Sequence, residues 1–259
     1  MTYSAVHEAA AQGFQASADA YERGRPDYPL EAIEFLFRHK VLKEGTAILD
    51  LGAGTGKLTR LLGPYTPALV AVEPSSAMRR KLLESKSSAK VFEGTAEKIP
   101  LPDGSVDGVV CAQSFHWFEG TSALKEIHRV LRPGGHLALL WNVRDEAIDW
   151  VARLTELIDP YGHGAPRYRT GRWRASFLET RLFGSLQANS FRHCQIGPAE
   201  HVVDRIASIS FIASLPPGKR SMVLAQVREL LATHSMTRDL ARVRLPYRTD
   251  LFWCERLGC

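Results

Sequence analysis

Five short apolar runs, separated by segments with helical spacing, do the most to constrain how this chain of 259 residues can fold. A strand that is apolar at successive positions is buried on both faces, as in a parallel sheet that helices cover on both sides. The runs are residues 46–51, 68–73, 89–93, 108–112 and 135–141. Residues 57–62 and 122–131 have helical spacing between the runs. The sequence therefore predicts a doubly wound, mostly parallel α/β sheet.

The second half of the chain has a different pattern. Residues 203–213 and 218–234 have helical spacing, and residues 245–257 have the pattern of a closing strand. We expect a single domain over residues 1–259 with four parts. These are a helical flap (1–45), a sheet core (46–142), an insertion with helices that caps a ligand crevice (148–240), and the closing strand (245–257).

The composition excludes several classes of protein. Hydrophobic residues make up 45% of the chain and charged residues 24%, which excludes a disordered chain. No apolar run reaches the roughly 20 residues that cross a bilayer, and the first residues lack the pattern of a secretion signal. The four cysteines and the histidines show no metal-ligand spacing. We therefore expect a cytoplasmic protein with reduced thiols, without a membrane partner or a metal, whose oligomeric state stays open.

The net charge of +5 is unevenly distributed. Residues 1–145 contain 17 Lys and Arg against 17 Asp and Glu, whereas residues 146–259 contain 16 against 11. A nucleic-acid partner would favour a continuous basic surface, so a neutral first half argues against that partner. The surplus indicates a local basic feature instead.

A glycine loop comes directly after the first apolar run. Gly52, Gly54 and Gly56 lie just after Asp50 and before the first helical segment. Glycines there let the backbone approach a ligand closely. A nicotinamide-binding loop would have its third glycine at position 57, which is Lys57, and an acid at position 50 would repel a pyrophosphate. The loop therefore favours a ligand with a positively charged end.

A second acid lies at the end of the second apolar run. Glu73 ends that run, where a carboxylate can accept hydrogen bonds from both hydroxyls of a ribose. Pro74 and Met78 come next and can lie against a purine ring, and Glu97 comes after the third run, where it can meet an adenine amino group. Together with the glycine loop, these residues predict a nucleoside that carries an amino-acid tail.

These motifs resemble those of the class I S-adenosylmethionine-dependent methyltransferases, in particular the methyltransferase type 11 domain. The resemblance covers essentially the whole chain and implies a Rossmann-like sheet of seven strands, the last one antiparallel. It implies that S-adenosylmethionine is the cofactor, with its ribose on Glu73, its adenine beside Ala96 and Glu97, and its methionine part held by Asp50 and the glycines.

A narrower resemblance is to the small-molecule subgroup that includes the trans-aconitate methyltransferases. It rests on Tyr21 and residues 25–29, on residues 112–118, and on residues 208–212 with 248–251. It implies that Tyr21 and Arg25 belong to a flap over the cofactor carboxylate and that Gln113 contacts the cofactor. Without the resemblance, Tyr21 and Arg25 are equally well surface residues of an N-terminal helix. Members of the subgroup act on different substrates, so it does not name the acceptor.

The acceptor side is predicted from residues at or beyond the ends of the fourth and fifth runs. His116 comes after the fourth run, where it can position a substrate or accept its proton, or simply pack in a loop. Trp117 and Trp141 are either a cover for the transferred methyl group or core residues. Arg169 and Arg172 belong to an arginine cluster that is either a solvated face or a binding site for a carboxylate or phosphate of the acceptor.

The sequence thus predicts an enzyme that transfers a methyl group from S-adenosylmethionine to a small organic acceptor, one that is anionic if the arginine cluster binds it. Carbon methylation of a quinone or polyketide ring is an alternative. A protein that binds the cofactor without catalysis is another. Neither the acceptor nor the methylated atom can be read from the sequence.

Overall fold

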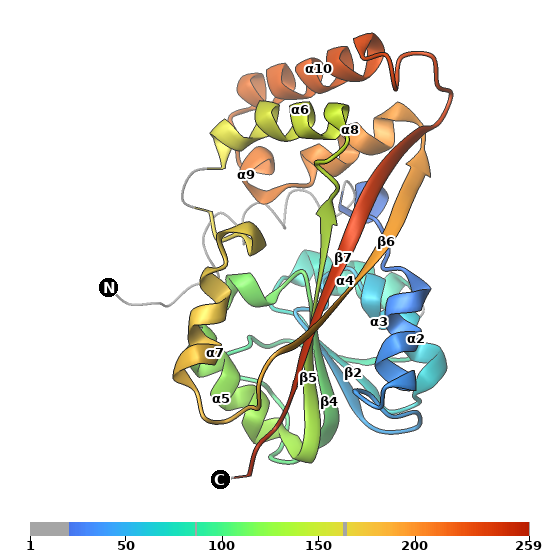
Figure 1. The fold of residues 1–259 in the computed structure, drawn as a ribbon. Helices are drawn as coiled ribbons and strands as arrows, with labels where there is room; N and C mark the ends of the chain where they lie inside the picture. Colours follow the sequence, from blue (N-terminus) through green and yellow to red (C-terminus); the bar gives the residue numbers. More distant parts are fainter. Residues whose placement is uncertain (1–20, 86, 163–164, 259) are drawn as a thin grey trace.

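The computed structural model describes residues 21–85, 87–162 and 165–258. Their strands form one sheet in the order β3-β2-β1-β4-β5-β7-β6 (Figure 1). The strands are β1 (Ile48–Leu51), β2 (Leu69–Val72), β3 (Lys90–Phe92), β4 (Val106–Ala112), β5 (Leu131–Arg144), β6 (Gln187–Gly197) and β7 (Val243–Glu255). β1 to β5 are parallel, and β7 runs antiparallel to both of its neighbours. The predicted doubly wound, mostly parallel sheet of seven strands is confirmed.

Helices cover both faces of this sheet. α2 (Leu30–Arg38) and α3 (Lys57–Leu62) lie on one face, and α5 (Gly120–Val130) and α7 (Ala175–Glu179) lie on the other (Figure 1). The other helices are α4 (Ser76–Glu84), α6 (Asp149–Ile158), α8 (Ala199–Ala207), α9 (Ser210–Ala213) and α10 (Pro217–Thr233). Because both faces are covered, all four residues of β1 are buried.

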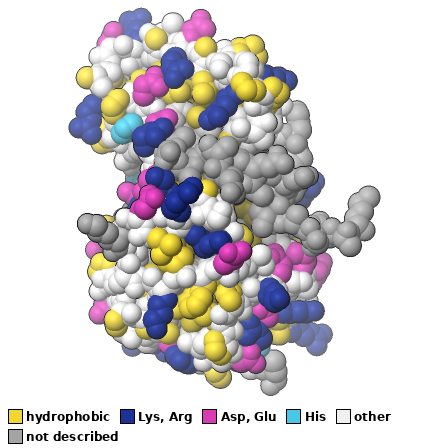
Figure 2. Space-filling view, turned by 180° about the vertical axis from the view of Figure 1, so that it is seen from behind, with side chains coloured by type: hydrophobic (Ala, Val, Ile, Leu, Met, Phe, Trp, Pro, Cys, Tyr) yellow, Lys and Arg dark blue, Asp and Glu magenta, His cyan; other side chains and the backbone are white. Residues whose placement is uncertain are grey.

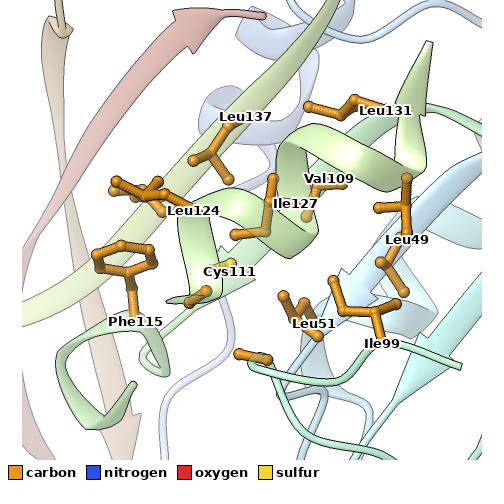
Figure 3. Close-up of a cluster of buried hydrophobic side chains, with 14 of the residues drawn as sticks. Leu49, Leu51, Ile99, Val109, Cys111, Phe115, Leu124, Ile127, Leu131 and Leu137 are labelled. Carbon is orange, nitrogen blue, oxygen red and sulfur yellow. The ribbon is translucent and has the colours of Figure 1, made fainter. Parts of the chain in front are cut away.

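The periodicity of α5 explains how it packs. Its apolar residues recur at helical spacing, and Leu124 and Ile127 lie among strand side chains such as those of Val109 and Cys111 (Figure 3). The helix begins after Glu119, whose carboxylate accepts hydrogen bonds from the first backbone N–H groups of the helix. The burial of this apolar face anchors the loop that joins β4 to α5.

A third cluster of apolar side chains forms a cap above the sheet. It joins α6, α8 and α10 to the first residues of the long strand β7 (Figure 1). Tyr247 of β7 is fully buried in this cluster. The cap therefore stands over the carboxyl ends of the parallel strands.

Two elements differ from the expectation. β6 was not predicted, because it is an edge strand whose first residues are polar and exposed. The predicted helix over residues 203–213 is two helices, α8 and α9, broken at Ser208. The hydroxyl of Ser208 donates to the backbone oxygen of Arg205 at 2.8 Å and accepts from Nε of Arg25 at 3.2 Å. Side-chain bonds of this kind compete with the helical pattern.

The face of the molecule in Figure 2 has no large surface patch of a single charge. Lysine and arginine side chains alternate there with aspartate and glutamate side chains. Within the described ranges, no helix is both long enough and apolar enough to cross a membrane.

Candidate functional site

The site lies where the order of the strands reverses. From β1 the chain proceeds to β2 and β3 on one side, and then returns to β4 and β5 on the other. In open α/β sheets, ligands bind in the crevice at the carboxyl ends of the strands at such a switch point. Here the loop after β1 holds Gly52, Gly54 and Gly56, and the loop after β4 begins with Gln113 and Ser114.

The first two glycines of the loop have different tasks. Gly52 has φ +72°, and a Cβ there would lie 2.6 Å from Cβ of Ser114, so only glycine lets the two loops meet. Gly54 has φ +58°, and the atom nearest to its Cβ position is the hydroxyl of Tyr21, 4.0 Å away. Among the described residues, the backbone at Gly54 therefore faces open space that a ligand can fill.

Asp50 supplies an unpartnered acceptor beside that space. Its side chain is fully buried, and its Oδ2 accepts from the hydroxyl of Thr59 at 2.6 Å. Its Oδ1 has no hydrogen-bond partner among the described residues. Burial, with a further contribution from the charge of Glu73, raises the pKa of Asp50 to about 7. Asp50 lines a crevice of about 450 Å³, open solvent included, and its free oxygen suits a cationic group there.

Glu73 joins the glycine loop to the end of β2. Its Oε2 accepts from the backbone nitrogen of Gly54 at 3.0 Å, and its Oε1 accepts from that of Ser75 at 2.8 Å. The residue is 7% exposed, and burial raises the pKa of its carboxyl group. A carboxylate has about four acceptor positions, so two remain for the hydroxyls of a ligand.

The residues predicted to contact adenine line neither crevice. Met78 is 2% exposed and Ala96 is 3% exposed, so these two side chains present almost no surface. Glu97 is exposed, and its Oε1 accepts from the backbone nitrogen of Glu119 at 2.9 Å. Pro74 comes next to Glu73 and is partly buried. The assignment of these four residues to adenine stays a prediction.

A second crevice, of about 890 Å³ with open solvent included, shares part of its wall with the first. Five residues line both, namely Tyr21, Arg25, Gln113, Asn142 and Arg205. Gln113 has φ +58°, which is strained for a residue with a side chain, and its amide nitrogen donates to the backbone oxygen of Asn142 at 2.9 Å. Strain of this kind at the end of β4 is typical of a functional site.

The short segment from Tyr21 to Asp27 contributes residues to the walls of both crevices, and ion pairs hold it in place. Lys57 of α3 contacts Asp27 at 3.0 Å, and Arg60 contacts Glu22 at 2.8 Å. On the other side, Arg23 contacts Asp204 of α8 at 2.9 Å. The segment therefore bridges the helix after the glycine loop and the cap. The preceding residues of the predicted flap, 1–20, lie outside the described residues.

His116 lines the second crevice as a neutral imidazole. Its Nδ1 is 3.1 Å from Nε1 of Trp141, which can only donate, so the ring proton is on Nε2. Burial, and then the charge of Arg25, lowers the pKa of His116 to about 3. No described residue accepts from Nε2. The geometry therefore supports His116 as a hydrogen-bond donor to a substrate and disfavours it as a base.

The two predicted tryptophans lie in different surroundings. Trp117 lines the second crevice. Trp141 is fully buried and stacks on Tyr168 at a ring distance of 4.7 Å. It therefore reaches the crevice only through its bond to His116, as a core residue that orients the imidazole.

The two arginines predicted to bind the acceptor, Arg169 and Arg172, do not lie in the same crevice wall. Arg169 lines the second crevice and lies 3.3 Å from Glu146 and 3.4 Å from Asp159. Arg172 is exposed and lines neither crevice. The turn after α6 and the segment after β5 bring these two acids, which are distant in the sequence, to Arg169.

Two arginines that were not predicted from the sequence line the second crevice. Arg144 is the last residue of β5, and Arg205 is on α8. A signal for Arg205 was present, because it lies on the apolar face of its helix, three residues after Val202 and beside Ile206. Asn142 was also missed, although it is 9% exposed and lines both crevices.

The raised pKa of Asp50 leads to a prediction about pH. Below pH 7 this carboxyl group becomes protonated and no longer attracts an ammonium group, so the affinity for a ligand with that group should fall as pH falls. Between pH 8 and pH 6 we expect a loss of about tenfold in the affinity for S-adenosylhomocysteine. Calorimetric titration measures it.

The matched variant for this prediction is Asp50→Asn, which keeps an acceptor for the hydroxyl of Thr59. It should bind more weakly than the wild type at pH 8 and show no dependence on pH in this range. The same slope in both proteins would assign the effect to another group.

The comparisons with known proteins agree with this geometry. Residues 49–139 match the methyltransferase domain family. An uncharacterized methyltransferase of Mycobacterium bovis is 39% identical over 236 residues, which cover 91% of this chain and 92% of that protein. The structure of a putative type II methyltransferase from Anaeromyxobacter dehalogenans has a TM-score of 0.68 at 22% identity and covers 90% of this chain and 97% of its own.

One structure of lower similarity contains ligands. It is a phosphoethanolamine N-methyltransferase of Haemonchus contortus in complex with phosphomonomethylethanolamine and S-adenosylhomocysteine, with a TM-score of 0.57 at 14% identity over 98% of this chain and 60% of its own. Fold, family match and the long alignment with the mycobacterial relative point to the same conclusion. The chain belongs to the class I S-adenosylmethionine-dependent methyltransferases.

Proposed function

We propose that this methyltransferase acts on a small organic molecule that binds in the second crevice, beside His116 and Trp117. The observation that carries the proposal is the shared wall of the two crevices, in which Gln113 and Asn142 face both. A cofactor in the first crevice and an acceptor in the second would therefore meet at these residues.

Residues of the first crevice, together with the neighbouring Gly54 and Glu73, which are not part of its wall, fit the cofactor. The free Oδ1 of Asp50 suits the ammonium group of its methionine part, and the open space at Gly54 suits the close approach of that part. Glu73 has acceptor positions left for the ribose hydroxyls. We assign the cofactor carboxylate to Arg25, beside Tyr21, and a further contact to Gln113. When bound, S-adenosylmethionine supplies a methyl group on a positively charged sulfur.

In the second crevice the protein positions the acceptor. Methyl transfer is a direct displacement, so the alignment of the acceptor atom with the methyl group supplies much of the rate. Nε2 of His116 donates a hydrogen bond that fixes the acceptor, and Trp141 holds the imidazole in that orientation. Trp117 covers the crevice from the same 3-10 turn (Phe115–Trp117).

Two observations favour a small acceptor. The cap forms part of the wall of the second crevice, which includes residues of α8 and α9. The narrower resemblance to the trans-aconitate methyltransferases also supports a small molecule. Methylation of a quinone or polyketide ring is the weaker alternative, because an apolar ring gains little from a wall with several arginines.

The proposed cofactor site is tested by thermal unfolding with two ligands. S-adenosylhomocysteine should raise the melting temperature, by an amount that grows with its concentration, because it binds only the native state. NAD should leave the melting temperature unchanged, since Asp50 repels a pyrophosphate. A response to NAD and none to S-adenosylhomocysteine would falsify the proposed site.

A further inference from the structure

The second crevice contains more positive than negative charge. Its wall includes five arginines and two acids, namely Arg25, Arg144, Arg167, Arg169, Arg205, Glu146 and Asp159. Both acids are already engaged: Asp159 contacts Arg167 at 3.1 Å, and Glu146 contacts Arg169 at 3.3 Å. No other acid lines this crevice among the described residues. Among the described residues, three guanidinium groups are therefore left without a carboxylate partner.

None of the described residues accepts a hydrogen bond from a side-chain nitrogen of Arg205. It is 7% exposed, and its Nε and Nη1 are buried without a partner. A buried guanidinium with open donors is costly for a folded protein, so such a group is typically retained for a ligand. Since Arg205 lines the crevice, a ligand there can reach it.

Arg144 and Arg25 both lie near the charge of Arg205. Arg144 donates from Nη2 to the hydroxyl of Thr155 at 3.2 Å, but its buried Nε has no partner. Arg25 donates to the hydroxyl and the backbone oxygen of Ser208, both at 3.2 Å. Burial lowers the pKa of Arg25 and of Arg144 to about 10, and the next largest cause for each is the charge of Arg205. Arg205 is thus close enough to repel the charges of both Arg25 and Arg144.

The cofactor accounts for one of these three arginines. It brings a single carboxylate, which the proposed function assigns to Arg25 beside the glycine loop. Arg205 lines both crevices, whereas Arg144 lines only the second and lies at the end of β5, away from the glycine loop. The remaining pair therefore needs an anion that the cofactor does not bring.

We propose that Arg144 and Arg205 form the binding site for a carboxylate or phosphate group of the methyl acceptor. This rests on the proposed function, because it deepens the assignment of the second crevice to the acceptor. Two guanidinium groups from different elements, each with unpaired donors, can bind one anionic group through several charge-assisted hydrogen bonds. The acceptor is then a small acid or phosphate ester, and Arg169, held by two acids, is part of the wall rather than the anion site.

The test uses the whole protein saturated with S-adenosylhomocysteine and two probe anions, inorganic phosphate and malonate. Calorimetric titration at low ionic strength should show one saturable site, and the tighter probe tells whether the acceptor is a phosphate or a carboxylate. Arg205→Gln and Arg144→Gln should each bind that probe at least about tenfold more weakly. Arg192→Gln, which removes an exposed arginine of β6 outside both crevices, should bind like the wild type.

Melting temperatures and cofactor affinity separate the possible failures. Without a ligand, Arg205→Gln should melt no lower than the wild type, since the change removes a buried charge that lacks a partner. If S-adenosylhomocysteine does not bind the wild type, both the proposed function and this inference fail. If it binds but neither anion does, or if the two variants bind the anions like the wild type, this inference alone is overturned. Loss of S-adenosylhomocysteine affinity in Arg205→Gln with unchanged anion binding would also overturn it, because Arg205 would then serve the cofactor.

Discussion

Replacement of Glu73 by alanine is expected to weaken the binding of S-adenosylhomocysteine by roughly 2–4 kcal/mol, or about 30- to 1,000-fold. The change removes a charged acceptor for the ribose hydroxyls. It also leaves the backbone N–H groups of Gly54 and Ser75 without their partner, so the glycine loop loses its tie to β2. Calorimetric titration at pH 8, above the pKa of about 7 of Asp50, gives the dissociation constant.

Two variants make this result specific. Glu73→Gln keeps an acceptor but not the charge, and should bind with an affinity between those of the wild type and Glu73→Ala. Glu84→Ala, which removes an acid paired with Lys81 at the end of α4, should bind normally. An unchanged dissociation constant in Glu73→Ala would place the ribose elsewhere.

Replacement of His116 by alanine should lower kcat by roughly ten- to a hundredfold while the affinity for S-adenosylhomocysteine changes little. The side chain lines only the crevice assigned to the acceptor, and its loss removes the donor that orients the substrate. Because the pKa of His116 is about 3, its ring stays neutral between pH 6 and 8, so its titration adds no limb to the rate profile there. Steady-state kinetics with a methylated substrate measure both effects.

The control for this variant is His39→Ala, which removes an exposed histidine after α2. It should leave kcat unchanged. If His116→Ala lowers the melting temperature and the cofactor affinity together, the side chain serves packing only. If the loss of kcat shrinks as the pH rises, His116 acts as a base in spite of its bond to Trp141.

Those parts of the fold that are buried on both faces could be predicted from the sequence. β1 and β4 are short, mostly apolar runs because helices cover them on either side, which is typical of strands in a parallel sheet. β6 has no such pattern, since it is an edge strand whose long pairing with β7 depends on backbone hydrogen bonds. Backbone pairing does not select residue types, so the strand was hidden in a polar stretch.

In the candidate site, likewise, residues at strand ends could be predicted, whereas residues that only the packing brings together could not. The glycine loop, Asp50 and Glu73 were predictable because each stands at or directly after the end of a recognisable strand, and adjacent parallel strands bring their ends together. Arg144 and Arg205 are 61 positions apart on a strand and a cap helix, and only the packing of the cap brings them to one crevice. The pairing of Asp159 with Arg167 and Arg169 was equally hidden, because it depends on the turn after α6.

The close packing at Gly24 has a consequence for how such an enzyme can change its substrate. A Cβ at position 24 would lie 2.4 Å from the backbone nitrogen of Arg205, so the bridging segment and α8 meet backbone to backbone. The glycine loop, Asp50 and Glu73 belong to other elements. Mutations on the cap can therefore alter the acceptor without touching the cofactor residues, provided that they leave this close contact in place. Because the two backbones touch at Gly24, the segment from Tyr21 to Asp27 limits which substitutions α8 can accept. In the same way, α8 limits which substitutions that segment can accept.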